Sequence, residues 1–227
     1  MLRLEGVEFA RGGFRLAADI SVPSGITAVI GPSGGGKSTL LSLIAGFEVP
    51  DRGRVLWDRR DLGPLAPGAR LVAVLFQDNN LFPHLDVLAN VALGLAPRTR
   101  PTSEDVSRAR AALERVGLTG FEDRRPGALS GGQQSRAALA RVLLTDRPVV
   151  LMDEAFSALG PALRGEMLDL VRDLLPDATI LMVTHDPDDA LRVAQQVIFV
   201  EEGRVAPPVP TKAFFDAPSE AVRRYLE

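Results

Sequence analysis

The sequence contains no cysteine, which excludes disulfides, thiol catalysis and thiolate metal sites. It has only two histidines, His84 and His185, too few for a multi-histidine zinc site. No apolar run approaches the roughly 18 residues of a membrane-spanning helix, since the longest uncharged apolar run is 71–76. The N-terminus lacks the apolar core of a signal peptide. We therefore expect a protein that is cytoplasmic or held at a membrane by its partners.

Lysine is scarce as well. Of the 26 basic residues, only Lys37 and Lys212 are lysines, so we expect a lysine to mark a position where arginine does not serve. The formal charge of −3 and the pI near 5.5 argue against a nucleic-acid partner. With 227 residues, 46% of them hydrophobic, the chain fits one large domain or a core with an attached lobe.

The hydrophobic pattern separates a β-rich core from a helical lobe. We predict strands over 2–9, 14–22, 26–30, 53–58, 70–76, 149–152, 179–183 and 197–200, and core helices over 38–46, 161–175 and 186–194. Alternation of strands and helices predicts a parallel, doubly wound α/β sheet. Residues 86–146 show helical spacing that predicts about three helices. The core is thus expected over 1–85 and 147–206, the lobe over 86–146, and a tail with a short helix over 207–227.

A glycine-rich loop between a predicted strand and a predicted helix fits the P-loop pattern. Its residues are Gly31, Pro32, Ser33, Gly34, Gly35, Gly36, Lys37, Ser38 and Thr39. Glycines let backbone N–H groups turn toward phosphate oxygens, and the helix N-terminus adds its positive dipole end. We expect Lys37 on the β- and γ-phosphates and the Ser38 hydroxyl on Mg²⁺. The alternative is a merely structural turn, which the strand–helix context and the rare lysine disfavour.

Two carboxylates follow the apolar strand 149–152. Ligands of open α/β sheets bind at the carboxyl ends of the strands, where Asp153 and Glu154 stand. Asp153 suits magnesium, and Glu154 is the candidate general base that polarises an attacking water. An acidic helix N-cap is the alternative explanation, and the presence of the P-loop makes it the weaker one.

A second glycine-rich helix start lies at Leu129-Ser130-Gly131-Gly132-Gln133. Ser130 is placed to cap a helix that begins near Gly132, and its free N–H groups form another anion-binding surface. One chain thus carries two helix starts that can bind phosphate but only one predicted magnesium site. This combination predicts a homodimer. In that dimer, each nucleotide on one P-loop is covered by the Ser130 helix of the other subunit.

Together these motifs resemble the ATP-binding subunits of ABC transporters, and the resemblance covers nearly the whole chain. It implies ATP and Mg²⁺ as ligands and a single domain over 1–227: a P-loop NTPase of the ABC ATPase type, with a mixed sheet core, an N-terminal antiparallel β-part and a helical lobe. Gln77 matches the family's glutamine loop, which contacts magnesium and water and senses the membrane subunits. His185 matches the switch histidine that contacts the γ-phosphate. His84 has no such counterpart and is assigned to the structure or to the surface facing the membrane subunits.

Segments 77–85, 89–95 and 156–159 are similar to the ATPases of bacterial thiamine importers. Related subunits import ferric iron, polyamines, sulfate or molybdate, and most of those carry a further β-domain. The resemblance implies a peripheral protein on the cytoplasmic face of the inner membrane. Its partners would be integral permease subunits and, indirectly, a periplasmic substrate-binding protein.

Three positions depart from the family pattern. The aromatic residue that stacks on adenine is replaced by Arg11, with Phe9 and Phe14 as the nearest rings. The usual Asp-Glu-Pro ends in Ala155, and the aspartate that crosses the dimer interface is replaced by Gly160. A nucleotide switch with little hydrolysis therefore stays an alternative, beside an importer ATPase for another substrate. ABC-type ATPases of DNA repair or translation, and P-loop kinases, fit the sequence less well.

Overall fold

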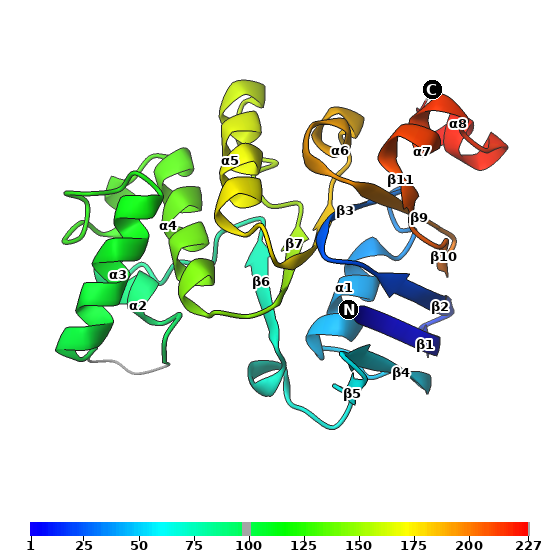
Figure 1. Cartoon of the computed structure of the whole chain (residues 1–227), viewed down its shortest axis with the longest axis horizontal. Helices are drawn as coiled ribbons and strands as arrows, with labels where there is room; N and C mark the ends of the chain where they lie inside the picture. The colour runs from blue at the N-terminus through cyan, green and yellow to red at the C-terminus, as the bar shows by residue number, and fades with distance from the viewer. Residues whose placement is uncertain (97–100, 227) are drawn as a thin grey trace. The chain divides into compact units, whose positions relative to one another are not determined.

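The fold is described from a computed structural model, which covers residues 1–96 and 101–226 (Figure 1). Residues 97–100 of the predicted lobe and residue 227 of the predicted tail lie outside the described residues. The chain forms two compact units. The first unit comprises Met1–Val74, Pro148–Glu154 and the chain from Asp177 onward; the second comprises Leu75–Arg147 and Ala155–Pro176.

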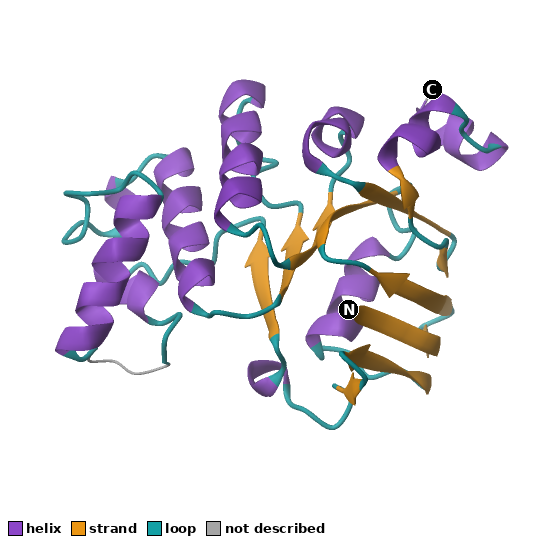
Figure 2. Cartoon of the chain, viewed as in Figure 1, coloured by secondary structure: helices purple, strands orange, loops and turns teal. Residues whose placement is uncertain are grey.

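The β-strands form a mixed sheet rather than a purely parallel one (Figure 2). Their bounds are β1 (Leu2–Arg11), β2 (Phe14–Val22), β3 (Gly25–Ile30), β4 (Arg52–Trp57), β5 (Arg60–Asp61), β6 (Val72–Phe76), β7 (Val149–Asp153), β8 (Thr179–Val183), β9 (Gln196–Glu201), β10 (Arg204–Val205) and β11 (Val209–Pro210). Among the described residues the order is β5-β4-β1-β2-β10-β9-β3-β8-β7-β6, with β11 paired to β9. This confirms the expected mixed core with an N-terminal antiparallel part.

The burial of the strands explains the two kinds of pairing. In β1 the buried residues alternate as predicted (Leu2, Leu4, Val7 and Phe9), and this strand pairs antiparallel with β2 and β4. In β8 every residue is buried, as expected for a strand covered on both faces, and it pairs parallel with β3 and β7.

Among the described residues, the first unit contains the α-helices α1 (Lys37–Ala45), α6 (Pro187–Val193), α7 (Thr211–Asp216) and α8 (Glu220–Leu226), and the 3-10 helix η1 (Pro67–Ala69). The short helix predicted for the tail is thus present as two helices. The second unit contains α2 (Val87–Ala92), α3 (Ser103–Arg115), α4 (Gly131–Leu144) and α5 (Pro161–Leu174). No helix in the described ranges is both long enough and apolar enough to cross a membrane.

A buried arginine secures the C-terminal end of α1. Arg70 is 2% exposed, and its guanidinium donates hydrogen bonds to the carbonyls of Leu43, Ile44 and Leu65 at 2.8, 2.9 and 3.2 Å. The last carbonyls of a helix lack intrahelical partners, and the helix dipole favours a cation there. Gly46 follows with φ +88°, and a Cβ at that position would lie 2.4 Å from Arg70 Nε. Arg70 therefore packs directly against the end of the helix that begins at the P-loop.

Candidate functional site

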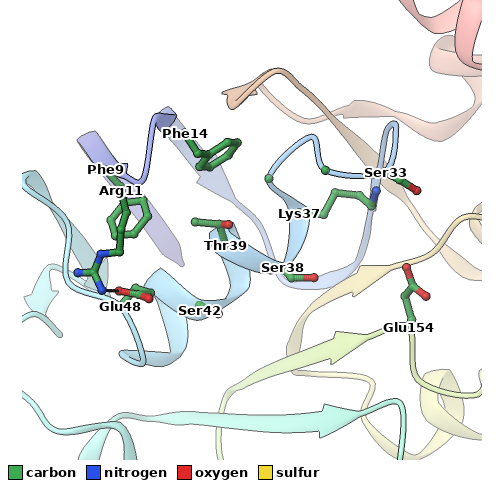
Figure 3. Close-up of a pocket in the computed structure, with 12 residues that line it drawn as sticks. Phe9, Arg11, Phe14, Ser33, Lys37, Ser38, Thr39, Ser42, Glu48 and Glu154 are labelled. Atoms are coloured by element: carbon green, nitrogen blue, oxygen red, sulfur yellow. Dashed lines mark ion pairs between the residues drawn. The ribbon is translucent and has the colours of Figure 1, made fainter.

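The P-loop connects the end of β3 to the start of α1, as its sequence predicted. Three of its glycines, Gly31, Gly34 and Gly36, have a positive φ that other residues rarely adopt. Gly31 has φ +146°, and a Cβ on it would lie 2.0 Å from the Val200 carbonyl oxygen of β9. Gly36 has φ +112° and is the N-cap of α1. The loop thus packs tightly against the sheet while the α1 N-terminus faces a pocket (Figure 3).

Lys37 is held inside this loop. Its ammonium group donates hydrogen bonds to the carbonyl oxygens of Gly31 and Pro32 at 2.7 and 2.9 Å, and the residue is 9% exposed. Burial lowers the pKa of Lys37, whereas the nearby carboxylates of Glu154 and Asp153 act in the opposite direction. A flexible, compact cation therefore lies where a phosphate group would enter the loop.

Ser38, at the start of α1, and Asp153, at the end of β7, place two oxygen atoms that can bind a metal ion next to each other. The Ser38 hydroxyl donates to Asp153 Oδ1 at 3.1 Å. Burial raises the pKa of Asp153, and the charge of Glu154 acts in the same direction. Hard oxygen ligands fit Mg²⁺, which usually takes one or two protein groups and completes its shell with water and phosphate oxygens. Among the described residues, no group of three or more acidic or histidine side chains is placed to hold a metal ion.

Glu154 stands directly after β7, at the edge of the same pocket (Figure 3). Its backbone has φ +49°, uncommon for a residue other than glycine, and its N–H donates to the Val183 carbonyl of β8 at 3.2 Å. The His185 Nδ1 atom lies 3.9 Å from Glu154 Oε2. Backbone strain of this kind clusters at functional sites. Within the first unit, the structure therefore brings together Lys37, Ser38, Asp153, Glu154 and His185.

Sequence reasoning missed the pair that supports the His185 loop. The Thr184 hydroxyl donates to Asp189 Oδ2 at 2.7 Å and accepts a hydrogen bond from the Asp186 N–H at 3.1 Å. Thr184 and Asp189 are both buried. Thr184 and Asp186 flank His185 in sequence and were the available signal, but the pairing of Thr184 with Asp189 depends on the turn that carries the histidine.

The pocket has a volume of about 590 Å³ and extends from Glu154 and Lys37 to an aromatic end. At that end Arg11 forms an ion pair with Glu48 at 3.2 Å, and its guanidinium carbon lies 5.5 Å from the Phe9 ring centroid. Phe9 is 5% exposed and belongs to the core, whereas Phe14 is half-buried. Figure 3 shows the Phe14 ring above the start of α1, so Phe14 is the ring best placed to contact a base.

The second unit contains the motif at 129–133. Ser130 is the N-cap of α4: its hydroxyl accepts from the Gln133 N–H at 3.3 Å, and the Gln133 side chain accepts from the Ser130 N–H at 2.9 Å. This reciprocal capping box confirms the predicted N-cap role of Ser130. The helix starts at Gly131, one residue before the predicted position. Gly131 and Gly132 form its first turn.

Gln77 follows β6 directly and is exposed, also in the second unit. Arg141 of α4 donates to the carbonyls of Asn79 and Asn80, two residues with positive φ, at 2.8 and 2.7 Å. Helix α4, which Ser130 caps, therefore anchors the loop that begins at Gln77. Nothing in the sequence pattern singled out Arg141, because its partners lie about 60 residues earlier in the chain.

Of the two remaining departures from the predicted family pattern, Gly160 has open surroundings. Gly160 is the N-cap of α5 with an ordinary φ of −62°, and a Cβ on it would meet nothing within 4 Å. A larger side chain therefore fits at Gly160, and the backbone does not require glycine. Ala155 follows the strained Glu154.

The sequence of residues 18–157 matches the family described as ABC transporter. The thiamine import ATP-binding protein ThiQ of Cereibacter sphaeroides is 56% identical over 229 residues, which cover 100% of this chain and 99% of that protein. The protein of the same name from a Ruegeria species is 53% identical, with the same coverage of both chains.

Solved structures agree with the fold. The ATP-binding cassette MJ0796, described as a dimer in a post-hydrolysis state bound to ADP and Pi, superposes with a TM-score of 0.78 at 29% identity over 93% of this chain and 99% of that chain. CbiO1 from Clostridium perfringens, described as part of the ABC transporter complex cbiONQ, gives a TM-score of 0.83 at 29% identity over 98% of this chain and 93% of that one.

Proposed function

Because this chain belongs to the ABC transporter family as an ATP-binding protein, we propose that it energises a bacterial importer for thiamine or thiamine phosphates by hydrolysing ATP. The observation that carries the proposal is one pocket lined by Lys37, Ser38 and Glu154, with Asp153 joined to it by the hydrogen bond from Ser38. A phosphate site with a metal ion needs this combination of groups. The substrate rests on the likeness to ThiQ proteins along the full chain.

Each residue of the pocket has one role in the hydrolysis of ATP. Lys37 leaves the loop carbonyls and binds the β- and γ-phosphates, which offsets negative charge in the transition state. The Glu154 carboxylate accepts a proton from the water whose oxygen attacks the γ-phosphorus. The bond from phosphorus to the bridging oxygen breaks, and ADP and phosphate are released. His185, whose Nδ1 atom lies 3.9 Å from Glu154 Oε2, is proposed to contact the γ-phosphate at the same end of the pocket.

Mg²⁺ fits the oxygen pair of Ser38 and Asp153, with Gln77 proposed as a further contact. When bound, the ion neutralises phosphate charge as a Lewis acid. Asp153 must be ionised to coordinate Mg²⁺. Because the pKa of Asp153 is raised, it is protonated at a higher pH than an ordinary aspartate. On acidification, the affinity for MgATP should therefore begin to fall at a higher pH.

The capped start of α4 points to a second subunit. Its N-terminal N–H groups, at Gly131 and Gly132, form a surface that can bind anions. The second unit builds this surface by itself. We infer a homodimer in which Ser130, Gly132 and Gln133 of one subunit close over the nucleotide of the other. The two subunits would attach to a membrane permease on the cytoplasmic face of the inner membrane, with a periplasmic binding protein delivering the substrate.

The substrate is tested by uptake. A strain lacking this subunit should lose uptake of labelled thiamine at low external concentration, while ferric iron and polyamine uptake stay normal. The wild-type gene should restore uptake, and Lys37→Ala should not. Unchanged thiamine uptake in a strain without a redundant importer would refute the substrate assignment, and loss of iron or polyamine uptake instead would reassign it.

The base end of the pocket makes a second prediction. Phe14→Ala should weaken ATP and GTP binding alike, by at least about fivefold, because stacking contributes roughly 1–3 kcal/mol and does not read the base edge. Arg11→Ala should change either affinity by less than about threefold, since exposed ion pairs such as Arg11–Glu48 contribute little.

Titration of the wild type and both variants with the two nucleotides, at fixed magnesium and salt, checks this prediction. Lys37→Ala serves as the strong reference and should weaken both nucleotides further. If Arg11→Ala weakens nucleotide binding and Phe14→Ala does not, the base lies against the Arg11 guanidinium. A hundredfold preference for ATP would reveal a base-specific contact.

Gly160 favours one alternative, an ABC-type switch that binds ATP and hydrolyses it slowly. Space beside Gly160 permits the aspartate typical of the resembled family. A Gly160→Asp variant that raises the ATPase rate more than tenfold would support the switch; an unchanged rate would support the transporter ATPase.

A further inference from the structure

A connection of three residues, 184–186, carries His185 from the end of β8 into α6, which is drawn in orange in Figure 1. The side chain of His185 is 59% exposed, and its Nδ1 atom lies 3.9 Å from Glu154 Oε2, beyond hydrogen-bond distance. The imidazole is therefore neither buried in the core nor hydrogen-bonded to the candidate base. Its location depends on the backbone of the connection.

Both ends of this connection are anchored by the first unit. At the strand end, the Thr184 N–H donates to the Val29 carbonyl of β3 at 3.3 Å. At the helix end, Asp186 is the N-cap of α6, and its side chain accepts a hydrogen bond from the Asp188 N–H at 3.0 Å. His185 thus stands between two residues whose backbones are held by the sheet and by the helix.

The Thr184 hydroxyl joins these two ends to each other. It donates to Asp189 Oδ2 in α6 at 2.7 Å, and it accepts a hydrogen bond from the Asp186 N–H at 3.1 Å. Thr184 is 5% exposed and Asp189 is 9% exposed, so water competes little for these hydrogen bonds. One buried hydroxyl therefore spans the histidine, from the residue before it to the residue after it and to the helix beyond.

The same strand end also holds the candidate base. The Glu154 N–H donates to the Val183 carbonyl at 3.2 Å, and Val183 directly precedes Thr184. Glu154 and His185 are thus positioned by adjacent residues at the carboxyl end of β8. The hydrogen bonds of Lys37 do not involve this connection, so a change at Thr184 leaves the phosphate loop in place.

We propose that Thr184, through its hydrogen bond to Asp189, is a positioning residue that fixes His185 toward the γ-phosphate of bound ATP. The inference rests on the proposed function, in which His185 contacts that phosphate. ADP has no γ-phosphate. The Thr184 hydroxyl therefore acts on the hydrolysis of ATP and not on the binding of ADP.

Thr184→Val is the decisive variant, because valine keeps the shape of the threonine side chain and removes only the hydroxyl. We expect kcat to fall by about 10- to 100-fold, as for a catalytic contact displaced by about 1 Å, with the Kd for MgADP within about twofold of wild type. Thr184→Ser keeps the hydroxyl and should retain kcat within about threefold of wild type. Phosphate release measures kcat, and titration calorimetry measures the Kd for MgADP.

Thr211→Val is the matched control, because it removes a hydroxyl in a similar setting of the same unit. Thr211 is 8% exposed, and its hydroxyl donates to the Ala194 carbonyl at 2.7 Å. This variant should lose thermal stability much as Thr184→Val does, yet hydrolyse ATP at the wild-type rate. An equal loss of kcat in both variants would show a general effect of stability and would overturn the inference.

A double-mutant cycle tests whether Thr184 acts through His185. In a His185→Ala background, Thr184→Val should lower kcat by no more than about a further twofold, because the side chain to be positioned is gone. A further loss of about tenfold or more would mean that Thr184 acts elsewhere. If His185→Ala lowers kcat while Thr184→Val hydrolyses ATP at the wild-type rate, the inference is wrong and the proposed function stands. If wild type does not hydrolyse ATP, the proposed function fails, and the inference with it.

Discussion

Replacing Glu154 by Gln should lower kcat for ATP hydrolysis by about 10²- to 10⁴-fold, the usual contribution of a general base. The amide has nearly the same shape as the carboxylate but cannot accept the proton of the attacking water. The Kd for MgATP should change little, because the hydrogen bonds of Lys37 and Ser38 do not involve Glu154. ATP bound without being hydrolysed should then hold two subunits together. Phosphate release measures the rate, and size-exclusion chromatography with ATP measures the dimer.

Glu114→Gln makes the same chemical change on the exposed surface of α3 and is the control. It should hydrolyse ATP at the wild-type rate and show no stable dimer. Hydrolysis by Glu154→Gln at the wild-type rate would mean that another group acts as base. A variant that binds nucleotide yet stays monomeric in millimolar ATP would refute the dimer in which Ser130 covers the partner's nucleotide.

The second large effect concerns folding stability. Arg70→Met should lower the free energy of unfolding by about 3 kcal/mol or more, since it leaves the buried carbonyls of Leu43 and Ile44 and the partly buried carbonyl of Leu65 without their cation. For a chain of this size that loss lowers Tm by about 6–12 °C. Arg70→Lys should recover only part of it, because an ammonium lacks the planar fork that spans several carbonyls.

Thermal and urea denaturation followed by circular dichroism measure the change. Arg172→Met is the control, because this arginine is 43% exposed by its side chain and pairs with Asp169 and Asp173 on the surface of α5. Exposed pairs of this kind contribute about 0–1 kcal/mol. An Arg70→Met protein within 1 kcal/mol of wild type would show that water or a shifted backbone satisfies the three carbonyls.

Features set by short stretches of sequence were predictable. The P-loop between strand and helix, the carboxylates after β7 and the Ser130 cap each depend on residues within a few positions of one another. Their local geometry follows from glycine conformations, strand ends and capping preferences. The family resemblance then placed Gln77 and His185 after two further strands.

Features set by distant contacts were not predictable. Arg70 and Arg141 look like ordinary surface cations in the sequence, and only the packed chain shows which carbonyls they serve. Strands of two residues, such as β10, are too short to produce a period. The contact between the rings of Tyr225 and Phe199 depends on how the end of the chain returns to β9.

The pairing partners of β3 also affect the order in which the protein can be built. This strand, which leads into the P-loop, pairs only with β8 and β9 among the described strands, and these lie about 155 and about 170 residues later. At about 5–20 residues per second on the ribosome, β3 waits roughly 8–30 seconds for its neighbours. During that time its edges are open to other chains, and the β1–β2 hairpin can form without it. Nucleotide affinity thus arises only near the end of synthesis, and the nascent chain is most exposed to aggregation before β8 emerges.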